Sequence, residues 1–186
     1  MTNDPFHSGK LLLAMPGIGD LRFEKSVIAI CSHDADGALG IGIGQHLGGV
    51  TVHGLLEQFE IDPSGMPDVP IFAGGPVEPK RGFVLHSLDW GGQGTIDVAG
   101  KWGLSASIDI LRVIGRPHGP SQWLVALGYA GWGAGQLDGE MTRHGWHLAD
   151  PSEALLFDLP AEQRWQSAFL STGIDPRMLA SESGHA

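Results

Sequence analysis

The sequence contains very little cysteine. Cys31 is the single cysteine among 186 residues, so no disulfide can form within the chain. A chain without disulfides fits a reducing compartment. Its first residues also lack the basic start and apolar core that are typical of a signal peptide. These two absences predict a cytoplasmic protein.

Basic residues and long apolar runs are also scarce. The chain has 11 Lys and Arg against 21 Asp and Glu, which gives a net charge of −10. Binding to duplex DNA depends largely on the neutralisation of phosphates, and the longest basic run is Lys80-Arg81. No apolar run is long enough to span a bilayer. We therefore expect neither nucleic acid nor a membrane as a partner.

Several motifs that carry known chemistry are missing. The sequence has no Gly-x-Ser-x-Gly nucleophile elbow, no Gly-Lys-Ser/Thr ending of a phosphate loop, and no His-Glu-x-x-His or Cys-x-x-Cys spacing. We therefore predict no cofactor, no metal and no assigned catalytic residue. A protein that is not an enzyme is the favoured interpretation.

The residues that are present predict many short elements in one domain. The chain is 42% hydrophobic and holds 29 glycines and 12 prolines. Apolar spacing predicts helices over 52–59, 108–114, 135–143, from Asp158 to 172, and a last turn from Asp175. Short apolar runs predict strands over 11–15, 26–33, 38–44, 71–73, 82–86, 95–98, 102–106, 122–127 and 146–148. Because strands and helices intermingle without strict alternation, the pattern favours an α+β fold with a mixed β-sheet and packed helices.

A run of glycines from Gly128 to Gly135 follows one of these strands. Glycine tolerates positive φ and lets other backbone approach closely. The glycines could allow tight packing while Tyr129 and Trp132 fill the core, or they could open a pocket for an anion at a helix N-terminus. Packing is the favoured interpretation, and both stay open.

Two further groups could carry chemistry. Cys31 and His33 are two apart on a predicted strand, which would place them on one face, and His86 could join them in a nucleophilic or zinc site. Side chains at this spacing lie roughly 6.5–7 Å apart at the backbone, so direct pairing is awkward. A buried, inert cysteine is the simpler interpretation. The group Ser105-x-Ser107-x-Asp109 is interpreted as the cap of a helix.

Several blocks occur in an order that resembles the YqgE/AlgH family of bacterial proteins. They are Phe23-x-x-Ser-Val-Ile28, His33-x-x-x-Gly-Ala38, Gly74-Gly-Pro-Val77, Arg81-Gly-Phe-Val-Leu-His86, Ser107-x-Asp109 and Gly128-Tyr-Ala-Gly-Trp132. The resemblance covers the chain from Gly9 to the terminal Gly-His-Ala186. The sequence departs from the family pattern at Gly44-Gln45-His46, where relatives tend to carry Asn, a basic residue and Pro.

The resemblance implies a cytoplasmic protein with a three-layer αβα-like core, a smaller αβ plait-like subdomain and no recognised cofactor. One branch of the family is named for regulating alginate production. We expect a flexible N-terminus over 1–8, a single domain over 9–180 with an internal boundary left open, and a polar tail over 181–186.

These observations predict a non-enzymatic cytoplasmic regulatory or adaptor protein that binds a partner or small ligand. The predicted binding surface comprises His33, Gly75, Arg81, His86, Tyr129 and Trp132. On this surface, Arg81 is expected to bind an anionic ligand. The glycine is expected to leave room for that ligand, and the aromatic side chains to pack around it. The alternatives are a hydrolase-like enzyme that uses Cys31 or His33, and a transcriptional regulator. The identity of the ligand or partner and the oligomeric state stay open.

Overall fold

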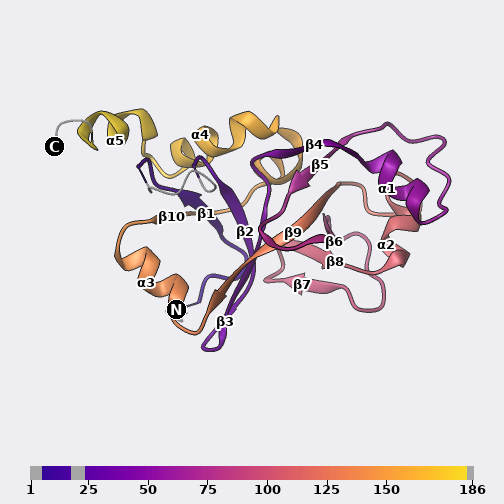
Figure 1. The fold of residues 1–186 in the computed structure, drawn as a ribbon, viewed down its shortest axis with the longest axis horizontal. Helices are drawn as coiled ribbons and strands as arrows, with labels where there is room; N and C mark the ends of the chain where they lie inside the picture. The colour runs from indigo at the N-terminus through magenta and orange to yellow at the C-terminus, as the bar shows by residue number, and fades with distance from the viewer. Residues whose placement is uncertain (1–5, 18–23, 184–186) are drawn as a thin grey trace.

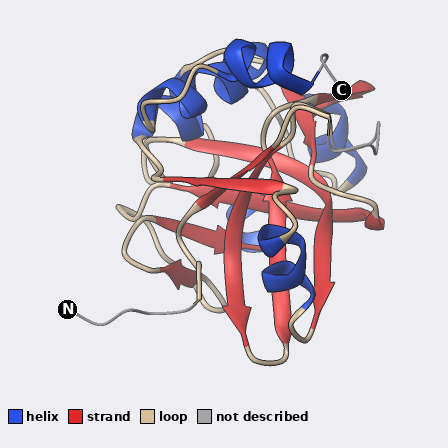
Figure 2. Cartoon of the chain, turned by 90° about the vertical axis from the view of Figure 1, so that its left-hand side faces the viewer, coloured by secondary structure: helices blue, strands red, loops and turns tan. Residues whose placement is uncertain are grey.

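Ten β-strands form one curled, largely antiparallel sheet in the computed structural model, which describes residues 6–17 and 24–183 (Figures 1 and 2). The strands are β1 (Leu11–Ala14), β2 (Val27–Asp34), β3 (Gly37–Gly42), β4 (His46–Thr51), β5 (Pro70–Ala73), β6 (Val77–His86), β7 (Ile96–Val98), β8 (Trp102–Ser105), β9 (Trp123–Gly133) and β10 (Trp146–Ala149). The predicted α+β class is therefore confirmed.

The longest strand, β9, organises the sheet. The main path runs β10-β1-β2-β3-β9-β6-β8-β7. The second half of β9 pairs with β3, whereas its first half pairs in parallel with β5, which in turn pairs with β4. Because β6 follows the other edge of β9, strands β3 and β5 lie end to end along the same edge. The end of β3 thus meets the end of β5.

Helices cover both faces of the curled sheet (Figure 1). They are α1 (Val52–Gln58), α2 (Ile108–Val113), α3 (Gln136–Thr142), a π-helical turn η1 (Ala154–Asp158), α4 (Ala161–Ser171) and α5 (Pro176–Ser183). On one face, α1 and α2 pack against β6 and the first half of β9, and α3 packs against β2 and the second half of β9. On the other face, η1 and α4 close the largest core cluster.

Helix α1 forms where capping and apolar spacing agree, whereas Ser107, at the N-cap of α2, makes no side-chain capping hydrogen bond. At the start of α1, the Thr51 hydroxyl accepts a hydrogen bond from the Gly54 N–H at 3.3 Å, and Leu55 and Leu56 are buried. On α4, Ala168 and Phe169 are fully buried. A buried side chain of the size of Phe169 stabilises the fold by roughly 1.5–3 kcal/mol.

The structure corrects several predicted elements. Strand β4 was not predicted, because His46–Thr51 holds two glycines and shows no alternation. Strand β9 continues through the glycine run to Gly133 instead of ending at residue 127. Asp158 ends the π-helical turn and does not cap α4, which begins after Pro160.

The prediction that Cys31 and His33 lie on one face is wrong, because β2 contains a β-bulge. The register of β2 against β3 shifts between Ile30 and Ser32. The extra residue restarts the alternation, so Cys31 joins the core under α4 while His33 lies beside α3. The two side chains therefore lie on opposite faces of the sheet.

Some predictions fall outside the described residues, namely residues 1–5 of the N-terminus, Phe23 and the tail from residue 184. The three-layer arrangement, the plait-like subdomain and the domain boundaries stay predictions. Among the described helices, none has the length and apolarity needed to cross a membrane.

Candidate functional site: a glycine-walled pocket

Backbone approaches backbone very closely where β3, β5 and β9 meet. The Gly42 N–H donates to the Gly74 carbonyl at 2.8 Å, and the Gly74 N–H donates to the Leu127 carbonyl at 2.8 Å. A Cβ added at Gly74 would lie 2.1 Å from the Gly128 carbonyl oxygen. A Cβ at Gly75 would also lie 2.1 Å from the Tyr129 backbone. Only glycine fits this crossing.

The packing interpretation of the glycine run is confirmed for its first member. Gly128 has φ +79°, and a Cβ there would lie 2.3 Å from the Gly75 carbonyl oxygen. Trp132 is buried and Tyr129 is partly buried against the core, as expected. At Gly135, by contrast, a Cβ would meet open space, and a left-handed φ of +70° at the start of α3 is the reason for glycine.

A pocket of about 190 Å³ lies beside this crossing. Its walls come from the ends of β3 and β5, the segments that follow them, the start of β2 and the middle of β9. The lining residues are Ser26, Val27, Ile28, Gly42, Gly44, Gln45, Leu47, Ala73, Gly74, Gly75, Pro76, Pro79, Leu127 and Ala130. We call this the glycine-walled pocket.

The chemistry of the glycine-walled pocket suits binding. No described residue in its lining has an ionisable side chain, and the polar side chains are those of Ser26 and Gln45. Pockets for drug-sized ligands occupy about 300–1,000 Å³, so this smaller space fits a small, mostly apolar molecule. Nothing in the lining could transfer a proton or attack as a nucleophile with an activating base.

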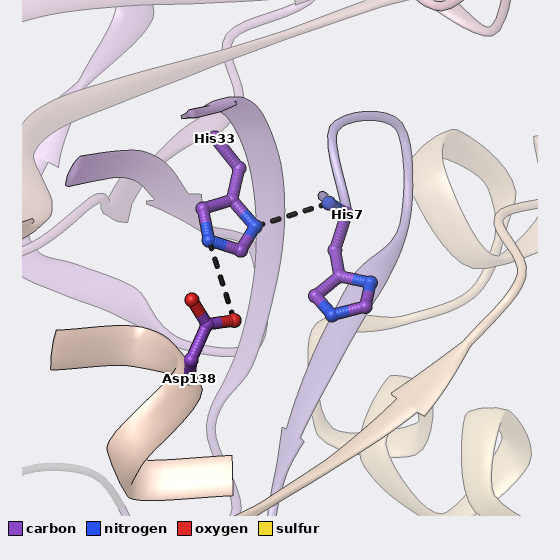
Figure 3. Close-up of side chains that lie close together, drawn as sticks. All are labelled: His7, His33 and Asp138. Atoms are coloured by element: carbon purple, nitrogen blue, oxygen red, sulfur yellow. Dashed lines mark hydrogen bonds and ion pairs between the residues drawn. The ribbon is translucent and has the colours of Figure 1, made fainter. Parts of the chain in front are cut away.

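A second cluster gathers His7, His33 and Asp138, whose potential ligand atoms lie within 4.8 Å of one another (Figure 3). His33 is 7% exposed, and its Nδ1 accepts a hydrogen bond from the His7 backbone N–H at 3.0 Å. Its Nε2 lies 3.7 Å from the Asp138 carboxylate on α3. The rings of Phe6 and His7 pack against the His33 ring.

The hydrogen bond that His33 accepts makes this cluster a poor metal site. A neutral imidazole has one protonated nitrogen. Because Nδ1 accepts the bond from His7, the proton belongs on Nε2, where it faces Asp138. A metal at Nε2 would have to displace that proton and leave the ring without any. The cluster instead ties the N-terminal segment and α3 to the end of β2.

The structure separates the residues of the predicted binding surface. Arg81 is exposed, lies 3.3 Å from the Glu78 carboxylate, and covers the Phe83 ring at 5.0 Å. Tyr129 packs edge-on against the same Phe83 ring, with ring centroids 5.9 Å apart. These two predicted residues are thus joined through an aromatic ring on one face of the sheet.

The other predicted residues lie elsewhere. Trp132 is on the α3 side, where its indole N–H donates to the Glu140 carboxylate at 2.7 Å, and His33 is held to the same helix. His86 is fully buried on the face of β6 opposite Phe83, because side chains alternate along a strand. Of the predicted residues, Gly75 lines the glycine-walled pocket. A role in ligand binding stays a prediction for each.

Cys31 is unsuited to nucleophilic chemistry. It is 5% exposed, and burial raises the pKa of its thiol to about 12, while a contact with the Trp102 indole has a smaller, opposite effect. The thiolate is the reactive form, and at neutral pH it is rare here. The expectation of a buried cysteine among apolar neighbours is confirmed. The alternative of a zinc site fails because His86 pairs with one end of β9, whereas His33 lies beside the other end.

Sequence reasoning missed most of the pocket lining. Leu47, Pro79 and Ala130 belong to three different segments, and no spacing rule connects them. Two signals were present in the sequence, the Gly74-Gly75-Pro76 block and the unusual Gly44-Gln45 segment, and both line the pocket.

The fold and pocket define a class: a curled, mixed sheet with a small apolar recess where strands meet end to end. The sequence matches the model of the AlgH-like family over residues 11–177. The chain therefore belongs to the AlgH-like family.

Named relatives agree with this assignment. The chain is 58% identical to the UPF0301 protein of Sphingopyxis alaskensis, covering 100% of this chain and 99% of that one. It is 55% identical to the UPF0301 protein of Novosphingobium aromaticivorans, with full coverage of both.

Two solved structures have a fold similar to that of this chain. The solution structure of the AlgH protein from Pseudomonas aeruginosa matches with a TM-score of 0.77 at 34% identity, covering 100% of this chain and 99% of that one. A crystal structure of a Corynebacterium diphtheriae protein matches with a TM-score of 0.70 at 18% identity, over 97% and 94% of the two chains, and supports the fold alone.

Proposed function

We propose that this protein is a cytoplasmic regulatory or adaptor protein that binds a small, mostly apolar ligand in the glycine-walled pocket. The observation that carries the proposal is the pocket itself, a recess of about 190 Å³ with no ionisable side chain in its described lining. Such a lining favours binding over catalysis.

The position of the pocket supports a role in signalling the bound state. Its walls include the ends of β3 and β5, which are joined by the hydrogen bond from Gly42 to Gly74. A ligand that contacts both ends would hold them together and would stabilise the crossing by its binding free energy. A partner that contacts this region could then distinguish the loaded from the free protein.

The alternatives have weaker support. A thiol enzyme at Cys31 conflicts with the raised pKa of the buried thiol. A transcriptional regulator that binds DNA directly would need a basic face, and the net charge of −10 opposes one. The name AlgH belongs to the Pseudomonas aeruginosa protein and does not state a ligand.

Native mass spectrometry of protein purified from its own host tests the proposal. Wild type should retain a small molecule. Leu47→Trp should lose it, because the larger side chain would occupy the pocket. The control is Leu170→Trp, which makes the same change at a 49% exposed position on α4 and should retain the molecule. Wild type without any bound molecule, or equal retention by Leu47→Trp, would refute the proposal.

A further inference from the structure

A chain of hydrogen bonds links a buried serine to a buried histidine, away from the glycine-walled pocket. The Nε2 of His86 lies 2.8 Å from the Ser105 hydroxyl, and Nδ1 of His86 lies 2.9 Å from the Ser87 carbonyl oxygen. The Ser105 hydroxyl also lies 2.7 Å from the Thr95 hydroxyl, which accepts a bond from the Gly92 N–H. His86 is 0% exposed and Ser105 is 2% exposed.

The acceptors in this chain fix the position of every proton. A carbonyl oxygen can only accept, so Nδ1 of His86 must carry the ring proton and donate it to Ser87. Nε2 is then an acceptor, and the Ser105 hydroxyl must donate to it. The Thr95 hydroxyl in turn donates to Ser105. Serine is therefore aimed at a basic nitrogen, as in nucleophilic catalysis, with a carbonyl in the place of the orienting carboxylate.

Ser105 lies in the lining of a groove on one face of the sheet. Ser105 on β8 pairs with Val84 on β6, so its side chain shares a face with Val84 and His86. On that face a groove of about 170 Å³ is lined by Ser105 together with apolar residues such as Leu55 and Val125. Phe59 and Ile108 at its walls are exposed large hydrophobics, and Lys80 is also exposed.

We infer that Ser105 and His86 form an acyl-transfer centre for esters of short, apolar acyl groups. The Ser105 Oγ attacks the acyl carbonyl while its proton passes to Nε2 of His86. The bond from the acyl carbon to the alcohol oxygen breaks, and the leaving alcohol takes that proton. Water then attacks the acyl-serine ester with the same proton transfers, which releases the carboxylic acid and restores Ser105.

The environment of His86 suits a base. Burial lowers its pKa below the ordinary value of 6.5, so the imidazole is neutral at physiological pH. The size of the groove limits the acyl group to a short chain, and the apolar side chains that form most of its lining favour an uncharged one. This inference is independent of the proposed function, because it concerns different residues and a different recess.

A phosphonofluoridate with a short alkyl chain is the direct probe. Reaction forms a bond from phosphorus to a serine oxygen, and fluoride leaves. We expect peptide mass spectrometry to place one adduct per chain on Ser105. Ser105→Ala should remain unlabelled, and His86→Gln should label about 100-fold more slowly, the usual contribution of a general base. Ser171→Ala on α4 should label like wild type, and p-nitrophenyl butyrate hydrolysis should follow the same order.

The pH dependence separates chemistry from a structural role. Labelling of wild type should slow as acid protonates His86. A purely structural network would give no such pH dependence at pH values where the protein remains folded. The position of the adduct is determined on the wild-type protein, so this part of the test does not depend on whether a variant folds. No adduct on Ser105, or equal labelling rates in folded His86→Gln and wild type, would overturn the inference.

Discussion

Single glycines determine whether the two strand ends can meet. Gly74 and Gly75 have no room for a side chain because the neighbouring backbone of Gly128 and Tyr129 already occupies the space. The clash is with main-chain atoms, which cannot turn away as a flexible side chain could. The crossing beside the pocket thus depends on residue identity at these positions.

We predict that Gly74→Ala destabilises the fold by about 3 kcal/mol or more, because overpacking against backbone forces the strands apart. Gly48→Ala is the matched control. It makes the same change in β4, where a Cβ meets nothing within 4 Å, and it should change stability by less than about 1 kcal/mol. Urea unfolding compares the two, and similar losses would show that the crossing tolerates a side chain.

The buried histidine His86 also gives a prediction for pH. Burial lowers its pKa, so the unfolded chain binds a proton at a pH where the folded chain does not. The contribution of His86 to the free energy of unfolding is fully present above the ordinary histidine pKa of 6.5 and is lost as the pH drops below that value. His147 acts in the same direction, because partial burial lowers its pKa too.

His86→Gln should therefore flatten the loss of stability between about pH 7 and about pH 5. His118→Gln, at an exposed histidine, should keep the wild-type slope. Unfolding midpoints in urea measured across this range provide the test. A wild-type slope in His86→Gln would mean that His86 titrates alike in the folded and unfolded chain.

At the scale of elements, a buried cation is one of the contacts that attach α4 to the sheet. Arg164 is 3% exposed; its Nε donates to the Leu159 carbonyl and its Nη1 to the Ile43 carbonyl, each at 3.0 Å. The guanidinium also lies 4.8 Å from the Phe72 ring centroid. Burial lowers its pKa to about 10, so it remains charged at neutral pH.

Arg164→Lys should cost about 2 kcal/mol of stability, because an ammonium cannot reproduce the planar fork that reaches two carbonyls. Arg112→Lys on α2, where the arginine is exposed beside Asp109, should stay within about 0.5 kcal/mol of wild type. Thermal or urea unfolding measures both. A wild-type stability for Arg164→Lys would show that positive charge alone is sufficient.

Local patterns predicted most elements but not how far they extend. The cap at Thr51 and the spacing of Leu55 and Leu56 correctly located α1, since both signals act within one turn. Local propensity predicts that the glycine run after Leu127 leaves the strand, yet residues 130–133 pair with β3. Pairing with a distant strand supplied what local propensity lacked.

At the scale of the whole molecule, the class of fold was predictable and the site was not. Interspersed strands and helices indicated α+β without reference to long-range contacts. The pocket exists because β3 and β5 follow one edge of β9 and meet at Gly42 and Gly74. That meeting is a property of topology. The bulge after Ile30, which separates Cys31 from His33, likewise had no signal in the sequence.

Amide chemical shifts show whether a small ligand occupies the glycine-walled pocket. A small-molecule extract of the host is added to isotopically labelled protein. We predict that the Gly42, Gly44, Gly74 and Gly75 amides shift together, while Gly92 and Gly100, which are outside the pocket lining, stay in place. Unchanged amides at the pocket, or shifts confined to another surface, would contradict the account.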